Sequence, residues 1–262
     1  MKIFFSSKCL EYSQPRHPES PERVSSTYDY LKNNSSRFTV HGSLFMEPIP
    51  CEDEDILLAH TSQLFDEVKG GKFFEPDTPA LSGIFEYARL AAGSAINAAE
   101  LCLKGEKTFS LMRPPGHHAT RNRLGGFCYF NNIAIASLKV RQAAGKIAII
   151  DFDCHHGNGT EDIFLGKKDF LYLSLHQSPL YPGTGLTSRE NCINYPLPAN
   201  TSPEKYLSVL DEGLKHVKKF NPDLLAISAG FDTYKHDPIA SLSLEEDTYK
   251  EIGSMLSKLN KP

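Results

Sequence analysis

The sequence has no Cys-X-X-Cys pair, although it contains six cysteines. They stand far apart, at positions 9, 51, 102, 128, 154 and 192. This spacing argues against a disulfide framework and against a structural zinc site built from thiolates. Isolated thiols of this kind predict a reducing compartment, so the expected location is cytoplasmic.

Long hydrophobic runs are also missing. The chain begins MKIFFSS, and the three apolar residues before Ser6 are too few for a secretory signal. No later run approaches the length of a membrane span. We therefore expect no membrane partner.

An excess of positive charge is absent too. The formal net charge is -4 and the isoelectric point is near 6.2. A protein that binds nucleic acid directly needs a basic face that neutralises phosphates. We therefore expect no direct nucleic-acid partner.

What the sequence does contain is an alternation of short β-rich runs and helical stretches. This alternation predicts a single domain over residues 1–262 with a three-layer α/β/α fold and a mainly parallel sheet. Helices are expected over 83–104 and 131–144, and capping residues predict further helix starts at 201–204 and 243–246. The expected strands are KIFFS, TFSLMR, KIAIIDFD, FLYLSLH and DLLAISAG.

The segment IAIIDFDCHHGNGTED carries the strongest chemical signal. Asp151, Asp153 and His155 follow an apolar strand at a spacing of two, which places them on one side of the chain. Two carboxylates in such a place repel each other unless a cation lies between them. Oxygen and nitrogen ligands with an open position are typical of catalytic zinc.

Asp232 is a further candidate ligand. It follows the apolar strand LLAISAG, and parallel sheets place their sites at the carboxyl ends of the strands. Taken alone, an aspartate after a strand is more often a turn residue. Its position in the expected sheet is what favours the metal interpretation.

Adjacent histidines, His117 and His118, follow the apolar run and turn LMRPPG. Alone, such a pair is more often a surface loop or a satisfied core imidazole. Together with the aspartate motif, the pair offers a general base whose pKa lies near neutrality.

Several motifs, in this order along the chain, resemble the zinc-dependent histone deacetylase superfamily, in particular its class II and bacterial branch. The resemblance implies a hydrolase that cleaves acetyl groups from lysine side chains of a peptide or protein, or from a small acylated amine. It makes Asp153, His155 and Asp232 the ligands of Zn2+ and leaves the oligomeric state open. The motifs are HPESPER, RPPGHHA, GGFCYFNNIAIA, DFDCHHGNGTEDIF, SLHQSPLYPGTG and SAGFD.

The resemblance also assigns roles beside the metal. It places Asp151 next to His117 and on a site for a monovalent cation, K+, which Ser174 shares. His118 is the expected proton shuttle and His117 its electrostatic partner. Asn158 is expected to orient His118.

Other positions match the family's substrate contacts. Phe127 of GGFCYF and Tyr181 of SPLYPG match the aromatic walls of the acyl-lysine tunnel, and Gly126 would leave room for the substrate. Asp77 in EPDTP matches a rim aspartate that holds the substrate backbone. Arg23 in PER matches an arginine near the acetate-release channel. Without the resemblance, the two aromatic residues would be read as core residues, Asp77 as a turn residue and Arg23 as part of a surface ion pair.

Three other functions stay open. An acetylpolyamine amidohydrolase uses the same chemistry, although polyamine-selective eukaryotic relatives carry an acidic gatekeeper where this chain has Ile239. An arginase-like hydrolase with two manganese ions needs more aspartates than HHGN supplies.

The third is a catalytically weak or inactive protein that binds acylated ligands. Family members carry a later strand ending in Gly-Gly-Tyr, whose hydroxyl polarises the substrate carbonyl, and this sequence lacks it. We therefore expect a C-terminally truncated deacetylase, with a strand missing beside DLLAISAG.

Overall fold

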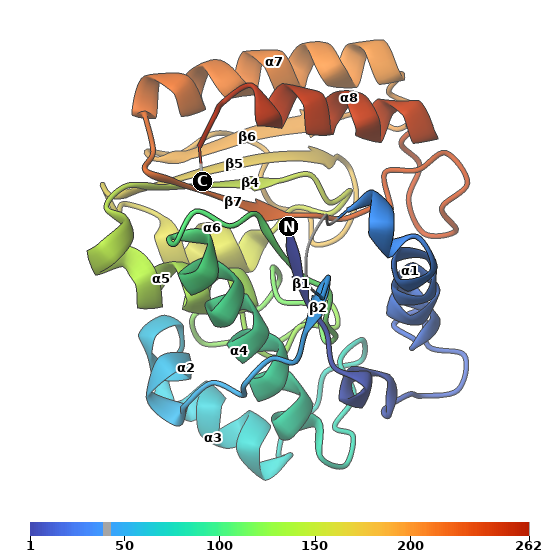
Figure 1. Cartoon of the computed structure of the whole chain (residues 1–262), viewed down its shortest axis with the longest axis vertical. Helices are drawn as coiled ribbons and strands as arrows, with labels where there is room; N and C mark the ends of the chain where they lie inside the picture. The colour runs from blue at the N-terminus through green and yellow to red at the C-terminus, as the bar shows by residue number, and fades with distance from the viewer. Residues whose placement is uncertain (39–42, 262) are drawn as a thin grey trace. The chain divides into compact units, whose positions relative to one another are not determined.

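The computed structural model describes residues 1–38 and 43–261. The chain divides into two compact units, Met1–Ala143 and Ala144–Pro262 (Figure 1). Each unit has its own parallel sheet and its own hydrophobic core. The single domain expected from the sequence stays a prediction.

The second unit contains four strands, β4 (Ile147–Asp151), β5 (Phe170–Gln177), β6 (Cys192–Leu197) and β7 (Leu224–Ser228). They form a parallel sheet in the order β6-β5-β4-β7. Every residue of β4 and β5 is buried, which explains why each strand begins with four consecutive apolar or aromatic residues rather than with an alternating pattern. Within the described ranges, β7 pairs with β4 alone, and the expectation that a family strand is missing beside β7 stays a prediction.

Two helices, α7 (Pro203–Phe220) and α8 (Glu246–Ser257), lie side by side along this sheet (Figure 1). A shorter helix, α6 (Asn158–Phe164), follows β4. The apolar side of α7 enters the core at the three- and four-residue spacing of an amphipathic helix. The residues on this side are Tyr206, Leu210, Leu214 and Val217.

Helix α7 begins where the sequence predicts, whereas helix α8 begins later than predicted. Ser202 caps α7 by accepting a hydrogen bond from the Lys205 amide, as its Ser-Pro-Glu context predicts. Helix α8 was expected to start near Ser243, but Glu245 is its cap. The Glu245 and Thr248 side chains each bond the other residue's backbone, which fixes the later start.

The first unit contains a smaller parallel sheet of β1 (Lys2–Phe4), β2 (Phe45–Met46) and β3 (Thr108–Ser110), in the order β2-β1-β3. Ile3, Phe5 and Leu111 belong to its core. Its helices are η1 (Ser7–Leu10), α1 (Glu22–Asn33), η2 (Ser35–Arg37), α2 (Asp53–Ala59), α3 (Ser62–Gly70), α4 (Ile84–Cys102) and α5 (Asn132–Ala144), the last of which ends at the boundary.

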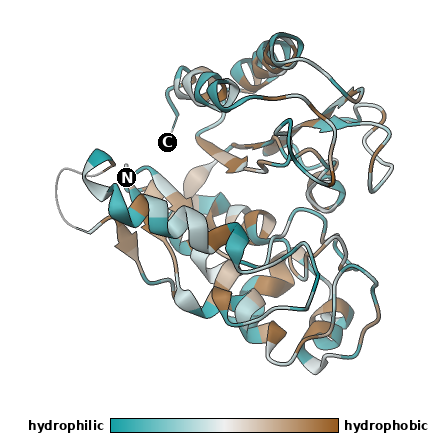
Figure 2. Ribbon diagram, turned by 90° about the vertical axis from the view of Figure 1, so that its right-hand side faces the viewer, coloured by the Kyte–Doolittle hydropathy of each residue, from teal (hydrophilic) through white to brown (hydrophobic). Residues whose placement is uncertain are grey.

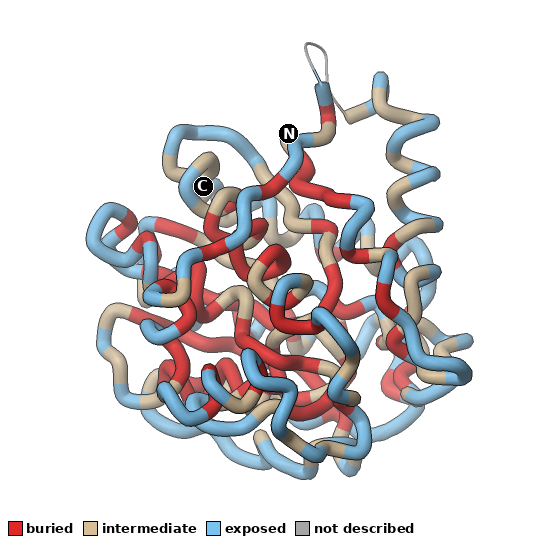
Figure 3. The backbone as a smooth tube through the Cα atoms, turned by 90° about the horizontal axis from the view of Figure 1, so that it is seen from below, coloured by how far each residue is buried: buried red, intermediate tan, exposed pale blue. Residues whose placement is uncertain are grey.

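The α/β class with parallel strands is confirmed, and all five expected strands are present. The sequence missed β2 and β6. Strand β2 has two residues, and β6 lies at a sheet edge with Asn194 and Pro196 breaking its apolar pattern. Figure 2 colours several of the strands as hydrophobic, and Figure 3 distinguishes buried from exposed backbone along the chain.

In the part of the chain that the structure describes, no helix combines the length and the apolar character needed to cross a bilayer.

Candidate metal centre and surrounding residues

Two neighbouring strands of the second unit bring Asp153, His155 and Asp232 together. Asp153 and His155 follow β4, and Asp232 follows β7. The two strands are parallel and in register, with Asp151 opposite Ser228, so their carboxyl ends reach the same edge. One possible ligand atom from each of the three residues lies within 4.8 Å of the others.

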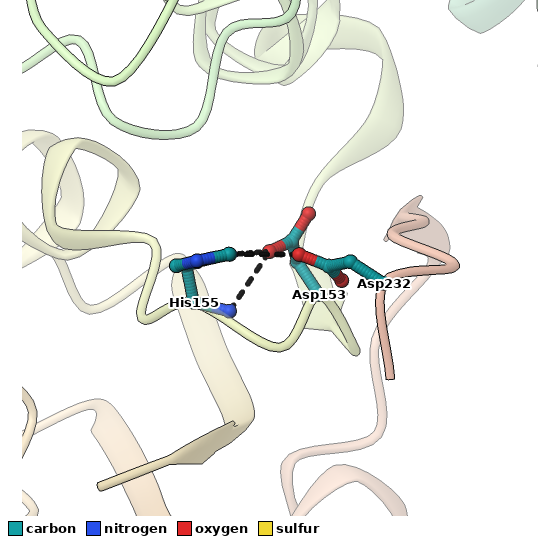
Figure 4. Close-up of side chains that lie close together, drawn as sticks. All are labelled: Asp153, His155 and Asp232. Carbon is teal, nitrogen blue, oxygen red and sulfur yellow. Dashed lines mark hydrogen bonds and ion pairs between the residues drawn. The ribbon is translucent and has the colours of Figure 1, made fainter. Parts of the chain in front are cut away.

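The carboxylates of Asp153 and Asp232 lie close together and both face the same nitrogen of the His155 imidazole (Figure 4). Its Nδ1 atom is 2.7 Å from Oδ2 of Asp232 and 3.1 Å from Oδ1 of Asp153. Backbone amides fix both carboxylates: the Cys154 amide donates to Asp232 and the His155 amide donates to Asp153, each at 2.8 Å. The ligand atoms are therefore held in place by the chain itself.

The electrostatics of this cluster suit a cation. Burial, and then the charge of Asp153, raise the pKa of Asp232 to about 6. Burial alone would lower the pKa of His155, but the hydrogen bonds to Asp153 and Asp232 and the charges of these two residues together outweigh burial and raise the pKa to about 10. Two carboxylates and one imidazole that face one point match the donor set of a catalytic zinc site, so these residues fit the ion.

Gly230 explains how β7 approaches the metal cluster, and the sequence analysis gave it no role. A Cβ atom at this position would lie 2.2 Å from Oδ2 of Asp153 and 2.5 Å from its Cα atom. Only glycine allows the two segments to come so close. The available signal was a glycine between an apolar strand and the aspartate in SAGFD.

Asp151 and Ser174 are register partners on β4 and β5. Asp151 accepts hydrogen bonds from the Tyr172 hydroxyl at 3.1 Å and from the Asp153 amide at 3.2 Å. The Ser174 hydroxyl lies 2.8 Å from Nδ1 of His176. The K+ site that these residues were expected to share stays a prediction.

Tyr181 lies next to the metal cluster. Its ring centroid is 6.4 Å from that of His155, in an edge arrangement, and its side chain is partly exposed. An aromatic ring in this place could border an acyl substrate bound at the cluster, which is the role that the family resemblance implies.

The histidine pair is buried in the first unit. The ring centroids of His117 and His118 are 4.0 Å apart, with the planes tilted by 48°. Gly126, at a φ of 55°, lies against them: a Cβ atom there would be 2.4 Å from Cδ2 of His118. The glycine therefore gives room to the imidazole, and its expected contact with substrate stays a prediction.

Phe127 follows Gly126 in a tight turn and also has a positive φ, 70°. Phenylalanine adopts this backbone region only at a cost, so the surroundings must hold it. Its amide donates a hydrogen bond to Thr78, the residue after Asp77, and its ring meets the edge of His17. Two expected substrate contacts, Asp77 and Phe127, thus belong to connected loops.

Arg23 is half exposed and pairs with Glu19 at 3.7 Å. The buried guanidinium of this unit is Arg113, the first residue of RPPGHHA, to which the sequence analysis gave no role. It forms a two-contact ion pair with Glu19 and lies over the ring of Tyr12. The expected role of Arg23 near an acetate channel stays a prediction.

The expected pairings of Asn158 with His118 and of Asp151 with His117 each concern residues of different units. Asn158 is the first residue of α6, and both histidines belong to the other unit. These pairings stay predictions.

Comparison with known proteins gives a consistent result. Residues 17–262 match the family described as the histone deacetylase domain. A probable deacetylase from Archaeoglobus fulgidus is 41% identical over an alignment of 268 residues, gaps included. The alignment covers 95% of this chain and 74% of that protein.

Solved structures give the same result. The HD domain of HDA15 superimposes with a TM-score of 0.91 at 31% identity, covering 99% of this chain and 82% of that one. An acetylpolyamine aminohydrolase from Burkholderia pseudomallei has a TM-score of 0.86 at 26% identity, covering 100% and 91%. The fold is therefore the one found in these two structures.

Proposed function

Because the chain belongs to the histone deacetylase domain family, we propose that it is a zinc-dependent deacylase acting on acetylated lysine side chains or related acylated amines. The observation that carries the proposal is the convergence of Asp153, His155 and Asp232 on one point. A family fold without these ligands would support only a binding function.

In the proposed reaction, Asp153, His155 and Asp232 hold the ion. When bound, zinc supplies Lewis-acid activation of the substrate carbonyl and of a water molecule. An imidazole nitrogen of His118 would take a proton from the water that attacks the acyl carbon and would deliver it to the amine nitrogen as the C–N bond breaks, which leaves a carboxylate and a free amine. His117 tunes that imidazole electrostatically, Asn158 orients it, and Asp151 supports the strand end that carries the ligands.

The remaining expected residues bind substrate. Phe127 and Tyr181 border the acyl chain, and Asp77 accepts hydrogen bonds from the backbone of a peptide substrate. Arg23 attracts the acetate product. These four assignments rest on the family resemblance together with the exposed or half-buried positions of the side chains.

The experiment that tests the proposal starts from chain loaded with one zinc per molecule. Acetate release is measured on acetyl-lysine peptides and on acetylated diamines, with several acyl chain lengths. We expect turnover that requires zinc. Two manganese ions per chain would overturn the proposal in favour of arginase-like chemistry, and stoichiometric zinc without turnover on any substrate would favour the non-catalytic acyl-binding alternative.

Acetylpolyamine hydrolysis is the second candidate, favoured by the likeness to the Burkholderia enzyme over the whole chain. Ile239, in the loop after β7, is 47% exposed and is therefore accessible to a substrate that approaches from solvent. An apolar residue there offers no charge to a polyamine cation. Ile239→Glu should therefore raise kcat/KM for acetylpolyamines relative to peptides; an unchanged ratio would show that selection occurs elsewhere.

A further inference from the structure

The loop between β5 and β6 carries Tyr181 and lies on two buried histidines that the proposed reaction does not use. We call residues 178–188 the Tyr181 loop. The two histidines are His156, which follows the candidate ligand His155, and His176, on β5. Their ring centroids are 4.6 Å apart, and 2% or less of each residue is exposed.

His156 connects the metal segment to the loop and to helix α6. Its Nδ1 atom lies 2.8 Å from the Thr184 hydroxyl, and its Nε2 atom lies 3.1 Å from the carboxylate of Glu161. A carboxylate accepts, so Nε2 donates to Glu161, and Nδ1 is left to bond the Thr184 hydroxyl. The same Glu161 oxygen accepts a hydrogen bond from Asn194 at 2.6 Å.

His176 holds the next residue of the loop. Its Nε2 atom donates to the Gly185 carbonyl at 3.1 Å, which leaves Nδ1 to accept from the Ser174 hydroxyl at 2.8 Å. Both nitrogens are thus used by a neutral imidazole. Strand β5 and the loop that follows it are tied together at this point.

Gly185 shows how closely the loop approaches the two rings. A Cβ atom at this position would lie 2.5 Å from His156 and 2.7 Å from His176, and the glycine has a φ of 73°. Further along, the Thr187 carbonyl accepts a hydrogen bond from Asn194. Glycine is required where backbone meets side chains so closely.

We infer that His156 and His176 are positioning residues that fix the Tyr181 loop against the metal segment. His155 and His156 are consecutive, so one short piece of backbone holds both a candidate metal ligand and the loop anchor. The backbone segment that positions the candidate metal ligand His155 therefore also positions the Tyr181 loop. The consequence for substrate binding rests on the proposed function, whereas the anchoring rests on the contacts alone.

A matched pair of variants tests the anchor. Thr184→Val removes the hydroxyl that bonds His156 and keeps the side-chain shape. Thr187→Val makes the same change three positions later, at an exposed side chain whose carbonyl, not its hydroxyl, forms the bond to Asn194. Zinc content is set to one per chain in both.

The first readout does not need activity. The sequence has no tryptophan, so Tyr181→Trp places the single tryptophan on the loop, and its fluorescence can be excited selectively over that of the tyrosines. In that background, we expect Thr184→Val to increase acrylamide quenching and lower anisotropy, and Thr187→Val to leave both unchanged. Equal behaviour of the two variants would overturn the inference, whether or not the chain is a deacylase.

The second readout is kinetic and uses the chain with Tyr181 intact. Loss of one hydrogen bond predicts about a 5-fold rise in KM for an acetyl-lysine peptide, with kcat nearly unchanged. A fall in kcat at constant KM would instead assign Thr184 to the chemical step and contradict a positioning role.

Conservative replacements of His156 separate its two contacts. His156→Asn places an amide near the Nδ1 position and can keep the bond to Thr184, whereas His156→Gln places one near Nε2 and can keep the bond to Glu161. In the Tyr181→Trp background, we expect acrylamide to quench the tryptophan less in the His156→Asn variant than in the His156→Gln variant. The reverse order would show that Glu161, not Thr184, is the contact that positions the loop.

Discussion

Nδ1 of His155 and Oδ2 of Asp232 lie 2.7 Å apart, although 77 positions separate the two residues in the chain. The pairing of β4 with β7 creates this approach, because it aligns the carboxyl ends of the two strands. The candidate metal centre is therefore a product of sheet order. A change that removes either side chain should remove the centre.

Asp153→Ala and Asp232→Ala should each abolish stoichiometric zinc binding, whereas Asp77→Ala should keep it. A tetrahedral site with three protein ligands and one open position cannot compensate locally for a lost ligand. Metal analysis after gel filtration measures the result. Zinc retained at one per chain by both ligand variants would contradict the assignment.

Gly230→Ala should weaken zinc binding by roughly 10- to 100-fold without removing a ligand, as the loss of supporting contacts does at other sites. The added Cβ atom would meet Asp153 at its Cα atom as well as at its carboxylate, so the backbone must move. Competition with a zinc chelator measures the affinity.

Gly253→Ala is the control, because a Cβ atom there meets nothing within 4 Å. Gly253 lies inside helix α8, so alanine should raise stability by about 1 kcal/mol through helix propensity. Equal zinc affinities for the two variants would show that the approach of Gly230 to Asp153 is not needed.

Gly126→Ala should retain zinc and lose most turnover. The Cβ atom would displace His118, which lies outside the metal cluster but is the proposed proton shuttle. Removal of general acid–base catalysis costs about 100- to 10,000-fold. His118→Ala gives the reference value for kcat, and a Gly126→Ala enzyme of normal kcat would argue against the shuttle role.

Stability should fall as the pH falls from about 6.5 to about 4, partly because of His60. Burial lowers the pKa of this residue to about 4, so in this window the unfolded chain binds a proton that the folded chain excludes. Its Nε2 atom accepts from the Asn131 amide at 2.8 Å, and its Nδ1 atom lies 2.9 Å from the Thr120 carbonyl. Protonation would destroy the acceptor.

His60 therefore accounts for a loss of about 3 kcal/mol in the free energy of unfolding when the pH falls from neutrality to below 4. His60→Gln should be less stable at pH 7 but should show a shallower loss of stability between pH 6.5 and 4. Urea unfolding at a series of pH values measures both. Parallel pH profiles for the two proteins would rule out His60 as a source of the dependence.

The sequence by itself determined the α/β class and the identity of the candidate ligands. Strands β4 and β5 are buried along their whole length, so each begins with a run of four apolar or aromatic residues, and Asp153 and His155 follow β4 in a fixed local spacing. Local patterns of this kind need no knowledge of distant contacts. The same holds for the Ser202 cap of α7.

Tertiary structure alone decided which distant residues meet. That Gly230 lies against Asp153, that His156 bonds Thr184, and that Arg113 rather than Arg23 is the buried arginine all depend on strand order and loop path. A sequence pattern records what each segment prefers, but a close approach depends on the positions of two segments at once. Such contacts appear only when the sheet has brought the segments together.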